Sequence, residues 1–144
     1  MTPERSDALI ASADRLVPDA QGFGRDVIRR AIAGGLISPD VPAETVARKA
    51  RSFGQALTLV IKNADMLASI RKVLSVGTVV PFMMGDEQTF QASIRREARG
   101  VLADQAESIG LDLEGTLAAD WHEVIEATCD AVFGAARTTA AKAA

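Results

Sequence analysis

The chain has few side chains with which to do chemistry. Its 144 residues include one histidine, His122, one cysteine, Cys129, and no tyrosine. Histidine is the commonest metal ligand and the usual general base near neutral pH, and one cysteine cannot form an internal disulfide or a thiolate cluster. The composition therefore disfavours both catalysis and metal binding, and we expect the protein not to be an enzyme.

The two reactive residues lie in one amphipathic segment. On a helix, His122 points about 100° away from Trp121, toward Glu123 and Glu126. We interpret His122 as a surface residue partnered by Glu126 four positions further on. Cys129 stands among apolar residues, which indicates a small buried hydrophobe.

Length and charge restrict the class of protein. We expect a single domain over residues 1–137, followed by a frayed, alanine-rich tail over residues 138–144. A net charge of −3 gives no basic field for nucleic acid. The N-terminus is charged where a secretory signal would be apolar, and no apolar run is long enough for a membrane span. We expect a cytoplasmic protein.

Helical periodicity is almost unbroken along the chain, and alternating strand patterns are scarce. Between Val76 and Gly85 the pattern is irregular, and Pro81 there removes one backbone donor. This stretch is either an extended connector or a distorted helical turn. The six predicted helices run from Pro3 to before Pro18, from Asp19 to Ala33, from Pro42 to Asn63, from Met66 to about Gly77, from Asp86 to before Gly110, and from Thr116 to Val132.

Five segments resemble, in their order, the helices of bacterial single-domain globins and of the globin part of flavohaemoglobins. They are TPERSDALIASADRLVPDA, GFGRDVIRRAI, ARKARSFGQALTLVIKNADML, LSVGTVVPFMMGDEQTF and LAADWHEVIEATCDAVF. The resemblance spans nearly the whole chain and implies an all-α, globin-like bundle of six to seven helices. Without the resemblance, the helical pattern predicts only a generic helical bundle. The alternative function for such a bundle is an adaptor unrelated to globins.

The resemblance also locates the residues that would bind haem. In the family, the proximal histidine lies three residues after a glycine and ten before an aromatic. Counted from Gly77 and from Phe90, both distances lead to Val80, which cannot ligate iron. The aromatic that packs against the haem corresponds to Ile37, or to Pro39 with a different gap.

The distal side of the haem site departs from the family pattern as well. The polar residue that the family has there corresponds to Ala47 or Lys49 in this chain. Met83 is an alternative axial ligand, although methionine at helical spacing is more often core filler. The resemblance therefore implies no haem and no metal. The equivalent of the haem pocket comprises Ile37, Phe53, Leu57, Val76, Val80 and Met83.

Family members without haem act as sensory or regulatory modules, and the resemblance implies the same function here. The expected partner is an apolar small molecule, another protein or a second copy of the chain. Phe133, Cys129 and Ile109 on the last two helices extend beyond the main apolar stripe, so they either form a homodimer surface or complete the core. The alternative function is a haem-binding globin for oxygen or nitric oxide with a non-histidine ligand.

Overall fold

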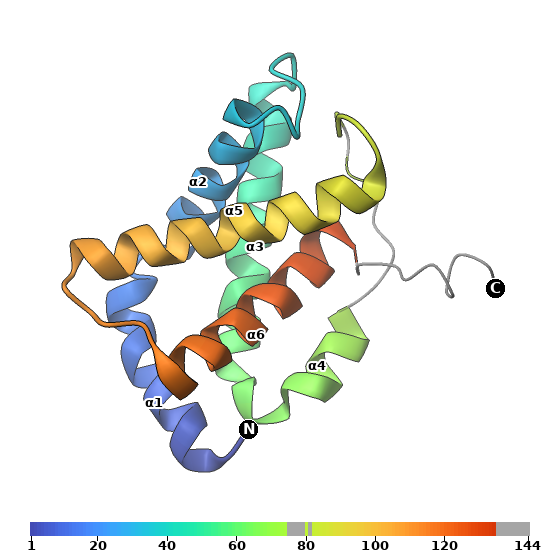
Figure 1. Ribbon diagram of the computed structural model, residues 1–144. Helices are drawn as coiled ribbons and strands as arrows, with labels where there is room; N and C mark the ends of the chain where they lie inside the picture. Colours follow the sequence, from blue (N-terminus) through green and yellow to red (C-terminus); the bar gives the residue numbers. More distant parts are fainter. Residues whose placement is uncertain (75–79, 81, 135–144) are drawn as a thin grey trace.

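The computed structural model describes residues 1–74, 80 and 82–134, and this part of the chain is all-α (Figure 1). It confirms the prediction of six to seven helices. Residues 75–79 and the predicted tail lie outside the described residues. The helices are α1 (Pro3–Leu16), α2 (Ala20–Ala33), α3 (Ala43–Lys62), the short 3-10 helix η1 (Ala64–Met66), α4 (Leu67–Leu74), α5 (Glu87–Ser108) and α6 (Gly115–Phe133).

Side-chain caps begin three of the helices where the sequence predicts them. Thr2 accepts a hydrogen bond from the Arg5 backbone N–H at 3.3 Å at the start of α1. Asp19 and Asp86 each accept from the backbone N–H three residues further on, at 3.0 and 2.8 Å. Each cap satisfies one of the free N–H groups of a helix N-terminus. Local sequence therefore fixes where α1, α2 and α5 begin.

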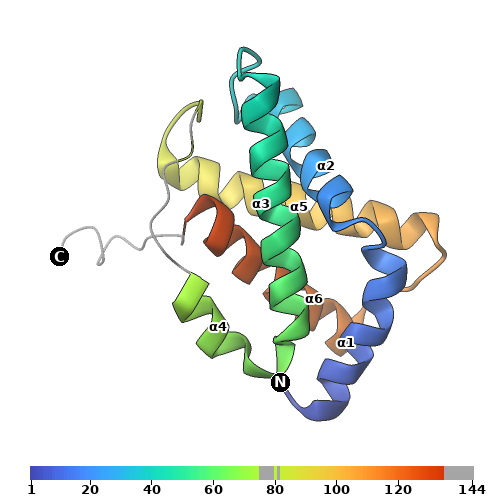
Figure 2. The same ribbon diagram turned by 180° about the vertical axis from the view of Figure 1, so that it is seen from behind.

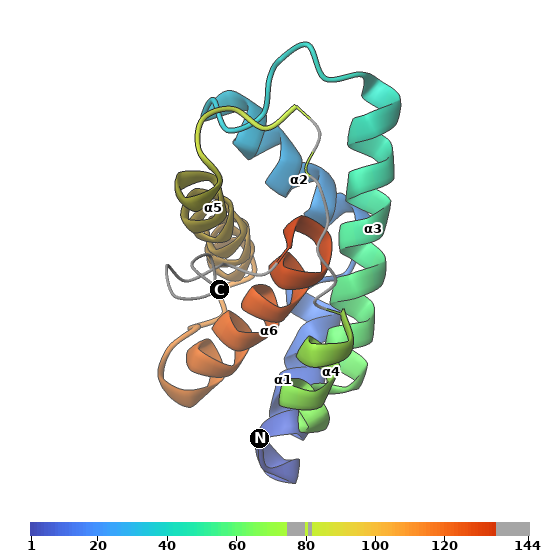
Figure 3. The same ribbon diagram turned by 90° about the vertical axis from the view of Figure 1, so that its right-hand side faces the viewer.

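The helices cross one another, and α6 lies at the centre. In Figure 1, α5 runs across α2 and α3. From behind, α3 lies beside α2 and in front of α6 (Figure 2). Figure 3 shows α6 between α5 on one side and α3 with α4 on the other. Because α6 contacts α1, α3, α4 and α5, ten of its 19 residues are buried.

A row of aromatic rings joins four of these helices. Phe23 stacks on Phe53 with ring centroids 5.8 Å apart. The Phe53 ring lies 6.2 Å from Phe133, and Phe133 meets Phe90 edge to face at 5.9 Å. Such pairs add to the free energy of burying the rings. The row runs from α2 through α3 and α6 to α5, so it fills the middle of the fold.

Two glycines let α2 and α3 pack backbone against backbone. A Cβ atom on Gly24 would lie 2.6 Å from the Ala50 carbonyl oxygen. A Cβ atom on Gly54 would lie 3.0 Å from the Gln21 backbone nitrogen. A Cβ atom cannot lie as close as 2.6 Å to a carbonyl oxygen. The close approach of α2 and α3 therefore depends on the absence of a Cβ atom at Gly24.

The Gly24→Ala variant tests this approach. We expect it to lose about 1–3 kcal/mol of unfolding free energy, because the added methyl group meets backbone in a packed interior. Urea denaturation followed by circular dichroism measures the loss.

Gly100→Ala is the matched control. There the nearest atom to the new methyl group is the end of the Arg30 side chain, which can move. We expect no loss, or a gain of up to about 1 kcal/mol from helix propensity. An equal loss at both positions would contradict a special role for the α2–α3 approach.

Candidate functional site

The structure divides the predicted pocket residues between a small cavity and the core. Ile37 and Val80 line the same small cavity. Its volume is about 10 Å³, the space of roughly one water molecule. The other lining side chains are Ile28, Val41, Thr45, Val46, Lys49 and Phe133.

The other predicted pocket residues lie elsewhere. Phe53 and Leu57 are fully buried in the core and do not line the cavity. Met83 is partly buried, and its backbone forms an antiparallel bridge with Ile37, but its side chain is not part of the cavity wall. Val76 falls outside the described residues.

The stretch before α5 is not helical where the structure describes it. α4 ends at Leu74, and Val80 lies in no helix. The Ser38 N–H donates to the Phe82 carbonyl at 2.9 Å, and the Met84 N–H donates to the Leu36 carbonyl at 2.8 Å. The described residues of this stretch therefore pair with the corner after α2 and form no helical turn. No helix in the described part of the chain presents Val80.

The C-terminal end of α6 is buried, and neighbouring helices supply its hydrogen-bond donors. A helix leaves its last four carbonyl groups without partners inside the helix. The last turn of α6 contains no basic residue that could satisfy them. Side chains of α3 and α5 do so instead. The pairs are Lys49 with the Val132 carbonyl (3.1 Å), Gln91 with the Phe133 carbonyl (2.6 Å) and Arg95 with the Gly134 carbonyl (3.2 Å).

Arg95 is the centre of this polar cluster. Its side chain is only 5% exposed. A guanidinium has five N–H donors, and five acceptors surround this one. Because every donor has a partner, the charge can be buried. The acceptors are a Glu126 oxygen (2.9 Å), the backbone carbonyl of Gln91 (3.1 Å) and its side-chain oxygen, an Asp130 oxygen (2.5 Å) and the Gly134 carbonyl (3.2 Å).

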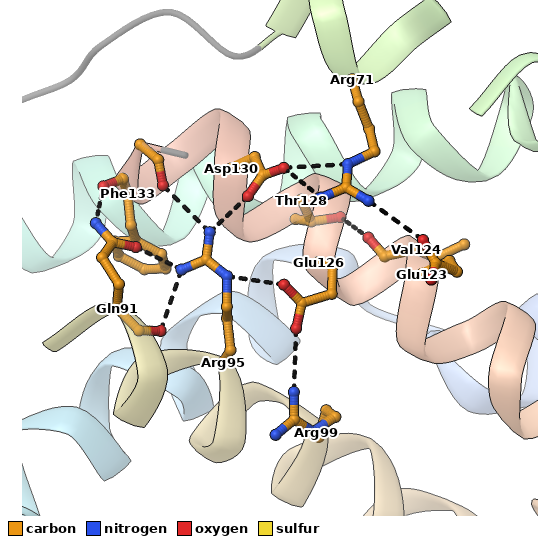
Figure 4. A network of polar contacts seen from close by, with 11 residues as sticks. Arg71, Gln91, Arg95, Arg99, Glu123, Val124, Glu126, Thr128, Asp130 and Phe133 are labelled. Atoms are coloured by element: carbon orange, nitrogen blue, oxygen red, sulfur yellow. Dashed lines mark hydrogen bonds and ion pairs between the residues drawn. The ribbon is translucent and has the colours of Figure 1, made fainter. Parts of the chain in front are cut away.

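The cluster continues to α4 and along α5 (Figure 4). Asp130, itself 7% exposed, also accepts from Arg71 of α4 at 2.7 Å. Arg71 pairs in addition with Glu123 at 3.2 Å, and Glu126 pairs with Arg99 at 3.1 Å. With Arg95, three guanidinium groups face three carboxylates, so the cluster has no formal net charge. No buried side-chain nitrogen or oxygen in the described part of the chain lacks a hydrogen-bond partner.

Arg71 attaches α4 to the rest of the protein. α4 contains no buried residue, and its apolar side chains Leu67, Ile70 and Leu74 pack only partly buried against the core. Desolvation opposes the charged form of Arg71, but the hydrogen bond and the charge of Asp130, together with Glu123 and Glu126, outweigh it and raise the pKa of Arg71. The cation is therefore favoured in the position where it bridges α4 and α6.

The Arg71→Met variant tests this attachment. We expect the amides of residues 67–74 to exchange hydrogen about tenfold faster, because the helix loses its ionic contact and opens locally. Hydrogen–deuterium exchange with mass spectrometry measures the change.

Lys72→Met is the control, since Lys72 is exposed on the same helix. It should leave the exchange of α4 unchanged. Equal exchange in wild type and Arg71→Met would contradict the role of Arg71.

Two interpretations of α6 need correction. His122 is exposed, as predicted, but Glu126 pairs with Arg95 and Arg99 and is not its partner. Cys129 and Phe133 are buried in the chain's own core, and Ile109 is partly buried. The first two side chains are therefore not available to a second copy, and they complete the core instead. Burial raises the pKa of the Cys129 thiol to about 12, so the thiol is protonated near neutral pH.

Sequence reasoning missed Arg95 and Asp130, the most buried charges of the site. Arg95 follows Ile94 directly and lies four residues after Gln91. Asp130 follows Cys129 in the same way. On both α5 and α6, polar residues thus stand at helical spacing next to the apolar stripe. This pattern is the signal that could have indicated a buried ionic contact between the two helices.

A larger hollow lies between the α1–α2 corner and the C-terminal half of α5. Its volume is about 560 Å³, within the range of roughly 300–1,000 Å³ that is common for ligand sites. Leu16, Phe23 and Val101 contribute apolar surface, and Asp26 and Asp104 contribute charge. We refer to this hollow as the α1–α5 groove.

Comparison of the chain with protein-family models, with curated proteins and with solved structures found no match. Within the described ranges, no group of three or more His, Cys, Asp or Glu side chains is placed to hold a metal ion. No helix there has both the length and the apolar character needed to cross a membrane.

Proposed function

We propose that the chain is a non-catalytic, globin-like helical module for binding or regulation that works without haem. One observation carries this proposal. The cavity at Ile37 and Val80 has a volume of about 10 Å³, whereas sites for ligands much smaller than haem begin at roughly 300 Å³. Phe133 and Lys49 form part of its wall, so α6 and α3 close the space.

The order and crossing of the helices support the globin-like part. Globins pack their helices pairwise at steep angles instead of in a parallel bundle. Here α2 packs across α5 and against α3, while α6 contacts α1, α3, α4 and α5 (Figure 1). The chain departs from the family at Val80, which lies in no helix in the described part of the chain.

The side chains around the cavity do not fit a haem. Val80 cannot ligate iron, and Met83 is not in the wall. His122 is exposed on α6, and the Cys129 thiol is buried and protonated. Among the lining side chains, the Lys49 amine has a nitrogen that could bind iron, but it already donates to the Val132 carbonyl. These residues favour the haem-free function over a haem globin with a non-histidine ligand.

We place ligand or partner binding at the α1–α5 groove. Its charged side chains pair with one another, since Arg30 meets Asp104 at 2.7 Å and Arg29 meets Asp26 at 3.9 Å. A site whose charges are already paired exerts little net field on a ligand. The groove therefore suits a largely apolar small molecule, or an apolar side chain of a protein partner.

Titration with hemin tests the haem-free function. We expect the wild-type protein to give only the broad Soret absorption of non-specifically bound hemin, because the cavity has no room for the macrocycle. The visible spectrum at increasing hemin concentration is the measurement.

The Val80→His variant is the control. Supplying the histidine should not produce a sharp Soret band, since the wild-type cavity lacks the volume for haem as well as the ligand for iron. A sharp band at one hemin per chain in the wild type, unchanged in Val80→His, would overturn the proposal and favour a haem protein with another axial ligand.

A further inference from the structure

One ion pair fixes the side of the α1–α5 groove, where the C-terminal half of α5 passes the junction of α1 and α2 (Figure 1). Arg30 of α2 meets two carboxylates of α5, Asp104 at 2.7 Å and Glu97 at 3.0 Å. Its guanidinium lies over Gly100, where an added Cβ atom would be 2.5 Å from a guanidinium nitrogen. Arg30 and Asp104 therefore bridge the two helices, and their charges are already satisfied.

Asp26 is held much more loosely. Its carboxylate lies 3.9 Å from the Arg29 guanidinium, a distance too long for a hydrogen bond. Arg29 is 71% exposed, and exposed ion pairs of this kind contribute little to stability. Because arginine is long and flexible, Arg29 can turn into the solvent at little cost. The short Asp26 side chain keeps its carboxylate beside the groove.

The charge that lines the groove is negative on balance. Asp19, the remaining acid of the lining, meets Arg25, which is not itself part of the lining, at 3.5 Å. Three acids against two bases leave one negative charge over an apolar floor. The five charged lining residues are Asp19, Asp26, Arg29, Arg30 and Asp104.

We propose that the α1–α5 groove binds small organic cations, with their apolar body over Leu16, Phe23 and Val101 and their positive group at Asp26. This inference rests on the ligand site proposed above. The volume of about 560 Å³ is ample for a phenylalkylamine. The apolar body supplies most of the affinity, because the net charge of the lining is small, and the positive group supplies the selectivity. An anion in the same place would meet the carboxylates of Asp19 and Asp26.

Three probes with one apolar body test this proposal. Phenylbutylamine is a cation near neutral pH, phenylbutanol is neutral and phenylbutyrate is an anion. Each is titrated into the nitrogen-15-labelled full chain, and the amide signals of Gly22, Val101 and Ser108 report binding in the groove. We expect the amine to bind about threefold to fivefold more tightly than the alcohol, which is the affinity equivalent of one exposed ion pair. Phenylbutyrate should bind most weakly.

The same titrations separate the two ways in which the proposal can fail. If the alcohol binds as tightly as the amine, or if phenylbutyrate binds more tightly, the preference for cations is wrong while the groove remains a ligand site. If none of the three probes shifts these amide signals, the ligand site itself is wrong as well.

The Asp26→Asn variant tests which carboxylate receives the cation. We expect its affinity for phenylbutylamine to fall about threefold to fivefold, to that of phenylbutanol, whose own affinity should not change. Asp65→Asn is the matched control, because it changes the net charge equally on η1, outside the groove lining. Both side chains are exposed, so both variants should fold. An equal loss in the two variants, or no loss in Asp26→Asn, overturns the assignment to Asp26.

Discussion

The structure depends on how the buried end of α6 is satisfied. A helix that ends in the interior brings carbonyl groups and the negative end of its dipole away from water, where each unpaired group is costly. α6 has no base of its own in its last turn, so α3 and α5 supply Lys49, Gln91 and Arg95. Arg95 in turn needs Asp130 and Glu126, and Asp130 brings Arg71 and α4 into the same cluster.

This arrangement also explains why the cavity is small. The donors hold the end of α6 against α3, and Phe133 then lies between Phe53 and Phe90. Phe133 and Lys49 form part of the wall beside Ile37 and Val80. An open void would instead cost about 24 cal/mol per Å³. The binding surface that we propose is therefore the α1–α5 groove on the outside of the fold.

The sequence predicted the helices well but not their polar contacts. Caps such as Asp19 and Asp86, and the stripe that includes Phe53 and Leu57, are local signals, and the helices begin where these signals are. Ile37 and Val80, which the resemblance to globins assigns to one pocket, line a single small cavity. The partnership of Arg95 with Asp130 joins residues 35 apart in the chain, and it depends on how α5 crosses α6, which no local pattern specifies. For the same reason Glu126 was assigned to His122 on its own helix.

A double-mutant cycle on Arg95 and Asp130 tests the role of the cluster most directly, with unfolding free energies measured in urea. We expect Arg95→Met and Asp130→Asn each to lose about 3–5 kcal/mol, and the double variant to lose less than the sum by about 1–3 kcal/mol. Arg95→Lys, which keeps the charge but has fewer donors, should be intermediate. The exposed pair Glu44 and Arg48 is the control, with coupling near zero. A loss below about 1 kcal/mol for Arg95→Met, or additive effects, would contradict a fold held together by this buried charge.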